Sequence, residues 1–203
     1  TTGIRYYYQD FDVRSRKFAN FLTDKAKIKK GDRVAICAGN CVQHIDMFYA
    51  IVRTGYIMTS YNVKLTEREL SELILKENPS VVLYEEEFGE KAAALKKRFP
   101  EVAFISTGNK KQEGDLACYQ EVLEYSDEDR SLPDHQFEDI AMLVHTGGTT
   151  GIPKAAMISY RALYYNVINQ VTAYGVNNRD VVYVCLPLFH AAAWNSLLMP
   201  LLY

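Results

Sequence analysis

Short apolar runs alternate along the chain with stretches whose apolar residues recur at helical spacing. Runs rich in β-branched and aromatic residues at 4–9, 33–37, 56–61, 81–84 and 102–106 predict strands. Between them, residues 13–26, 42–54, 67–78 and 88–99 place their apolar side chains on one helical face, which predicts helices. Strands that alternate with helices at this spacing predict a parallel α/β sheet.

Local signals mark where several of these helices begin and end. Gly55 ends the second predicted helix, and Thr66 with Glu69 forms a capping-box pattern before the third, which Pro79 closes. Further along, residues 140–145 and 155–158 are apolar runs typical of strands, and Ser159 is placed as the N-cap of a last helix. The sequence therefore predicts an α/β fold of layered parallel-sheet subdomains flanked by helices.

Residues 126–139 differ in character from the segments on either side. They are acidic, contain Pro133 and hold few apolar side chains, which is typical of a solvated connection. We therefore expect a first α/β subdomain at 1–125, an acidic connection at 126–139 and the start of a second subdomain at 140–203.

Composition excludes several classes of function. The net charge of −2, from 23 basic and 25 acidic residues, gives no electrostatic reason to expect nucleic acid or an anionic membrane as partner. The four cysteines lack zinc-site spacing, so no metal site is predicted, and free thiols fit a cytoplasmic protein. No signal peptide opens the chain, and its most apolar stretch, 191–203, is shorter than the roughly 20 residues of a bilayer span.

A glycine- and threonine-rich loop directly follows the predicted strand at 140–145. Its nine residues combine three glycines, whose backbone N–H groups can approach phosphate oxygens, with hydroxyl donors and one ammonium group. Pro153 before Lys154, and alanines after it, exclude the Walker pattern. The loop composition therefore favours a polyphosphate site, and leaves open a glycine-threonine hairpin that binds nothing.

At this loop the chain resembles the adenylate-forming family of acyl-CoA synthetases, luciferases and peptide-synthetase adenylation domains. The family signature Thr-Ser/Gly-Gly-Thr-Thr-Gly-x-Pro-Lys-Gly matches residues 146–154, with Gly147 as in fatty-acyl members and Ala155 in place of the last glycine. Residues 30–36, 50–55 and 186–190 also resemble family segments, in the same order and spacing. The resemblance implies a truncated N-terminal domain of such an enzyme, with its ATP-binding subdomain starting at residue 140.

The resemblance also implies roles for individual residues. His190 would lie beside the acyl carboxylate, whereas His44, His135 and His145 match no functional motif. Trp194 is placed either along an acyl tunnel or in the core. The ATP phosphates would be held by Thr146, Gly147, Gly148, Thr149, Thr150, Gly151 and Lys154.

The implied reaction joins a carboxylic acid to AMP, with Mg²⁺ expected, and passes the acyl group to coenzyme A. The family's adenine- and magnesium-binding segment, ribose-binding aspartate and C-terminal catalytic lysine find no match here, so we expect a longer protein and an inactive 203-residue chain. The closest implied class is a fatty-acyl-CoA ligase. An adenylation domain that loads a carrier protein, and a non-catalytic nucleotide-binding module, remain open.

Overall fold

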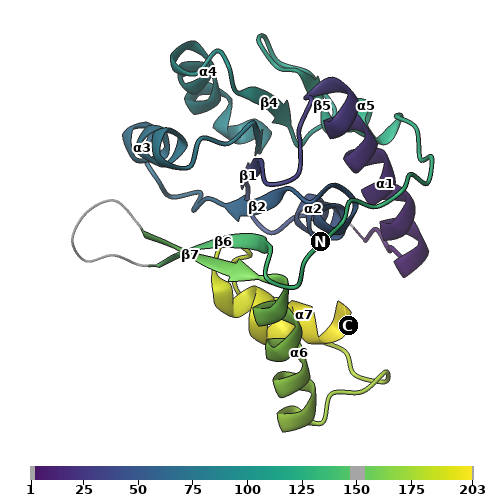
Figure 1. Cartoon of the computed structure of the whole chain (residues 1–203). Helices are drawn as coiled ribbons and strands as arrows, with labels where there is room; N and C mark the ends of the chain where they lie inside the picture. The colour runs from purple at the N-terminus through teal and green to yellow at the C-terminus, as the bar shows by residue number, and fades with distance from the viewer. Residues whose placement is uncertain (1–2, 147–153, 203) are drawn as a thin grey trace.

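The computed structural model describes residues 3–146 and 154–202 (Figure 1). Its first part contains α1 (Tyr8–Lys25), β1 (Arg33–Cys37), α2 (Val42–Thr54), β2 (Ile57–Ser60), α3 (Glu67–Glu77), β3 (Val81–Tyr84), the 3₁₀ turn η1 (Glu86–Phe88), α4 (Gly89–Arg98) and β4 (Ala103–Ser106). It continues with β5 (Ala117–Cys118), α5 (Tyr119–Leu123), β6 (Ile140–Thr146), β7 (Lys154–Ser159), α6 (Tyr160–Tyr174), the π-helix η2 (Ala193–Leu198) and α7 (Met199–Leu202).

The strands form one sheet in the order β5-β4-β3-β1-β2-β6-β7. All neighbouring pairs are parallel except β6 with β7, which are antiparallel. The central strand β1 is buried over its last four residues, as expected for a parallel sheet covered on both faces. The predicted parallel α/β fold is confirmed.

Alternate residues of the strands feed two separate hydrophobic cores. Val34 and Ile36 of β1 pack with α1 and α2, whereas Ala35 and Cys37 pack in the core that contains the buried leucines of α3 and α4. Figure 1 shows α3 and α4 on one side of the sheet and α1, α2 and α5 on the other. No helix within residues 3–146 and 154–202 is long and apolar enough to cross a membrane.

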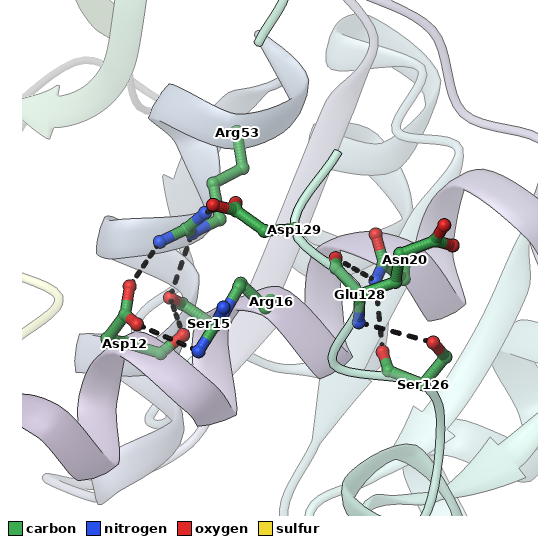
Figure 2. Close-up of polar contacts among 8 residues, drawn as sticks. All are labelled: Asp12, Ser15, Arg16, Asn20, Arg53, Ser126, Glu128 and Asp129. Atoms are coloured by element: carbon green, nitrogen blue, oxygen red, sulfur yellow. Dashed lines mark hydrogen bonds and ion pairs between the residues drawn. The ribbon is translucent and has the colours of Figure 1, made fainter. Parts of the chain in front are cut away.

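The acidic connection lies against the first part of the chain. Asn20 Nδ2 donates to the carbonyl oxygens of Ser126 and Glu128, at 3.0 and 2.9 Å, and Arg53 forms an ion pair of 3.3 Å with Asp129 (Figure 2). Beyond the connection, β6 pairs with β2, so residues on both sides of it share one sheet. The division into two subdomains stays a prediction.

The predicted strand at 4–9 is wrong, because α1 already begins at Tyr8. The Asp10 carboxylate accepts a hydrogen bond of 2.7 Å from the Tyr7 backbone N–H, and the Tyr6 ring packs 5.7 Å from that of Phe11. Capping and packing at the helix start therefore outweigh the β-propensity of the tyrosines. The short elements β5 and α5 were not predicted, because elements this short show no periodic pattern of apolar residues.

The buried His44 makes stability depend on pH. Its side chain is fully buried on α2, and its Nε2 has no hydrogen-bond partner in the part of the chain that the structure describes. Burial lowers the pKa of His44 to about 4, from an ordinary value of 6.5. Between these two pH values the unfolded chain binds more protons than the folded one, so folding stability falls as pH falls.

We expect the free energy of unfolding to drop by on the order of 3 kcal/mol through His44 between about pH 6.5 and pH 4. Urea titrations of the wild type and of His44→Phe at several pH values measure this. The substitution removes the titrating group and keeps an aromatic ring. The unfolding free energy of His44→Phe should therefore change less between these two pH values, by about the same 3 kcal/mol. Parallel profiles would show that His44 is not the group responsible.

Candidate functional site

The β6–β7 hairpin brings the two ends of the glycine-threonine loop together. The two strands lie side by side at one edge of the sheet (Figure 1), with the ladder running from Ile140↔Ser159 to Thr146↔Lys154. At its end the Thr146 hydroxyl donates to the Lys154 carbonyl oxygen at 3.2 Å, and both side chains are exposed. The pairing therefore fixes a hydroxyl and an ammonium-bearing residue on facing positions.

The residues between them include most of the predicted phosphate site. Gly147, Gly148, Thr149, Thr150 and Gly151 lie outside the described residues. Thr146 and Lys154 are the two members of the predicted set whose positions are described.

A small cavity joins the loop's first residue to the predicted acyl-site histidine. It has a volume of about 80 Å³ and opens beside the end of β2, where the carboxyl ends of parallel strands place ligand sites in α/β sheets. The chain brings together residues from three regions to line it: Ser60, Asn62, Leu65, His145, Thr146, Phe189 and His190.

The segment that presents His190 is held by an amide that the sequence did not indicate. Asn40, just after β1, donates to the Leu186 carbonyl oxygen at 2.9 Å and accepts from the Leu188 N–H at 2.8 Å. Trp194 donates from Nε1 to the Leu188 carbonyl oxygen at 2.6 Å, and its side chain is buried in the core. Of its two predicted positions, Trp194 takes the core one, and it helps to place His190 at the cavity.

His145, which matched no functional motif, lines the same cavity and contacts Glu77. Its Nε2 lies 2.6 Å from Glu77 Oε1, and its Nδ1 lies 3.2 Å from the Ser60 carbonyl oxygen. Glu77 Oε2 also accepts from the Thr59 hydroxyl at 3.1 Å. Glu77 and His145 therefore form a carboxylate–imidazole pair next to Thr146, the first residue of the loop.

The groups around the cavity suit an anionic ligand bound by hydrogen bonds and positive charge. Hydroxyls, an amide, an imidazole and a nearby ammonium group can donate to carboxylate or phosphate oxygens. Cysteine nucleophiles are disfavoured at β1 and just after it, because burial raises the pKa of Cys37 and of Cys41 to about 12. All four cysteines are free thiols, with Cys37 and Cys118 buried, Cys41 half-buried and Cys185 exposed.

Known proteins resemble the chain over nearly its whole length. The chain matches the family described as AMP-binding enzyme over residues 1–203. It is 26% identical over 200 residues to a medium-chain-fatty-acid–CoA ligase of Ectopseudomonas oleovorans, covering 93% of this chain and 36% of that protein. It is 27% identical over 205 residues to a 2-succinylbenzoate–CoA ligase of Oceanobacillus iheyensis, covering 99% and 38%.

A solved structure shows the same architecture. The crystal structure of a putative long-chain-fatty-acid CoA ligase from Rhodopseudomonas palustris superposes with a TM-score of 0.87 at 26% identity, over 98% of this chain and 49% of that one. The chain thus spans less than half the length of these relatives. The family match, together with this shared architecture, shows that the chain belongs to the AMP-binding enzyme family.

Proposed function

We propose that the whole protein activates a carboxylic acid with ATP as an acyl adenylate and transfers the acyl group to coenzyme A. The observation that supports this most directly is the cavity shared by Thr146, at the start of the signature loop, and His190, 44 residues later in the numbering. One end of this arrangement suits phosphates and the other suits a carboxylate, so the two reactants would meet at its centre.

In the proposed first step, a carboxylate oxygen forms a bond to the α-phosphorus of ATP and pyrophosphate leaves with the electron pair of the broken P–O bond. The Lys154 ammonium group and the hydroxyls of Thr149 and Thr150 would hold the β- and γ-phosphates, and His190 would orient the carboxylate. Catalysis would then consist mainly of positioning and charge neutralisation.

Mg²⁺ is expected to accompany ATP, but the described residues supply no ligand set for it. Residues 3–146 and 154–202 include no group of three His, Cys, Asp or Glu side chains that could hold a metal ion. No step of the mechanism is therefore assigned to metal ligands in this part of the chain.

The proposed acid is a fatty acid, and the proposed setting is the cytoplasm. Gly147 in the signature and the fatty-acid ligases among the relatives support the acid class. The named relatives also include a ligase for an aromatic acid, so the acid is a proposal to be tested against aromatic substrates. The 203-residue chain by itself is proposed to be inactive, because its relatives are more than twice its length.

Product analysis of the full-length protein tests this function. The protein is incubated with ATP, Mg²⁺, coenzyme A and one acid at a time, from medium- and long-chain fatty acids and aromatic acids. We expect AMP and acyl-CoA in equal amounts, with a fatty acid as the best substrate, and no product from the 203-residue chain. Formation of ADP, or acyl adenylate that reacts with a carrier protein and not with coenzyme A, would contradict the proposal.

A further inference from the structure

Glu77 and His145 form a pair beside the candidate site, outside the signature loop. The carboxylate belongs to the last residue of α3, and the imidazole to the residue before Thr146 on β6. Both side chains are largely buried, with 5% of Glu77 and 11% of His145 exposed. A carboxylate at the C-terminal end of a helix opposes the helix dipole, so this position is unfavourable unless a partner compensates it.

The two contacts of His145 require one more hydrogen than a neutral imidazole carries. Both ring nitrogens of His145 face oxygen acceptors, the Ser60 carbonyl on one side and the Glu77 carboxylate on the other. A neutral imidazole carries one N–H and can satisfy one of them. Both contacts are hydrogen bonds only when one additional proton is shared between His145 Nε2 and Glu77 Oε1.

The surrounding groups do not replace either partner. Arg33 on β1 donates to the backbone carbonyl oxygens of Glu77 and Asn78, at 2.8 and 2.7 Å, and not to the carboxylate. Among the described residues, the carboxylate contacts Thr59 and His145, with the Tyr61 hydroxyl also close to it. The Tyr61 ring lies 5.6 Å from the imidazole, and burial, with the nearby Glu77 charge, raises the pKa of Tyr61 well above its usual range. Cys37 and Arg33 also lie near Tyr61, and His190 lines the cavity.

The pair also attaches a part of β6 that the β2 ladder does not hold. The β2–β6 ladder pairs Met58 with Met142 and Thr59 with Leu143, two residues before His145. Beyond that point β6 pairs only with the edge strand β7 within the described residues. The contacts of His145 with Ser60 and Glu77 therefore tie the end of β6 to β2 and α3.

We propose that Glu77 and His145 are positioning residues for ATP binding, an inference that rests on the proposed function. By fixing the end of β6, the pair fixes Thr146 and, through the Thr146↔Lys154 register, the ammonium-bearing residue across the hairpin. Neither side chain needs to touch the nucleotide. The phosphate site is then built on a rigid support and not on a free strand end.

Steady-state kinetics of the full-length protein test the proposal. His145→Phe keeps a ring of similar size and removes both hydrogen bonds, and Glu77→Ala removes the carboxylate. We expect KM for ATP to rise about tenfold or more in each, the effect of losing a buried charge-assisted hydrogen bond, while KM for the acid and kcat change little. The double variant should be no worse than the worse single one, because the two residues act as a unit.

Two further variants separate positioning from general damage. In Glu77→Gln, the amide can donate to a neutral His145, which completes both contacts, so KM for ATP should stay within about twofold of the wild type. Glu72→Ala removes a carboxylate of the same helix that pairs with Arg68 on the surface, and should change nothing. Thermal unfolding of each variant checks that it is folded.

The kinetic results separate a failure of the positioning role from a failure of the proposed function. A wild-type protein without acid-dependent ATP use would overturn both. An active wild type whose KM for ATP is unchanged by His145→Phe would overturn the positioning role alone, as would equal loss in kcat and in KM for both substrates. Failure of Glu77→Gln to retain the wild-type KM would overturn the shared-hydrogen account.

Discussion

Replacing Lys154 by alanine in the complete protein is expected to lower kcat/KM for ATP roughly 5- to 150-fold, which corresponds to about 1–3 kcal/mol of transition-state stabilisation. The expected reason is the loss of the charge-assisted contact that Lys154 is proposed to make with a phosphate oxygen. Lys154 begins β7 opposite Thr146, and its side chain is exposed at the end of the hairpin, where a ligand can reach it. The same loss is expected for Thr150→Ala, whose residue lies outside the described ones.

Matched lysine variants make this test specific. Lys111→Ala removes an exposed ammonium group between β4 and β5, at the opposite edge of the sheet, and should leave ATP use unchanged. Lys154→Arg keeps the charge but changes its shape, so partial activity is expected. Wild-type kinetics in both Lys154→Ala and Thr150→Ala would discard the assignment of the loop to phosphate binding.

Replacing Asp46 by alanine should destabilise the fold by about 3–5 kcal/mol, the usual result of breaking a buried ion pair. Asp46 on α2 is fully buried and accepts two hydrogen bonds from Arg14 of α1, at 2.9 and 2.6 Å. The Tyr119 hydroxyl of α5 donates to the same carboxylate at 2.7 Å. Its removal leaves a guanidinium and a hydroxyl unpaired between three helices.

Asp12 provides the control for Asp46, because it also joins α1 to an arginine of α2. Its side chain is 47% exposed and contacts Arg16 and Arg53 (Figure 2), so Asp12→Ala should cost only about 0–1 kcal/mol. The double variant R14M/D46L should recover part of the loss, since it removes both charges. Urea denaturation measures all three. Equal losses for Asp46→Ala and Asp12→Ala would show that burial of the pair does not matter.

Much of the fold could be predicted because its signals are local. Residues 33–37 and 81–84 were predicted as strands and form β1 and β3, since short, mostly apolar runs bounded by turn residues are typical of buried strands. The Thr66 side chain accepts from the Glu69 N–H at the start of α3, as the capping-box pattern indicated. The start of α1 was missed because a run of tyrosines has β-propensity, which the capping by Asp10 overrides.

The supporting parts of the site could not be predicted for a different reason. The loop is recognisable because its residues are contiguous, but its supports are brought together by the fold. Asn40 reaches Leu188 across 148 residues, and Glu77 reaches His145 across 68. Nothing in the residues beside Asn40 or Glu77 marks them, because partners at such separations are chosen by the sheet order.

Exchange of labelled pyrophosphate into ATP by the full-length protein tests the central claim most directly, because it reports adenylate formation without need of an acyl acceptor. We expect exchange that depends on an added carboxylic acid and falls at least about fivefold in Lys154→Ala. Absence of exchange with every acid that the protein binds, or exchange that Lys154→Ala leaves intact, would contradict the account.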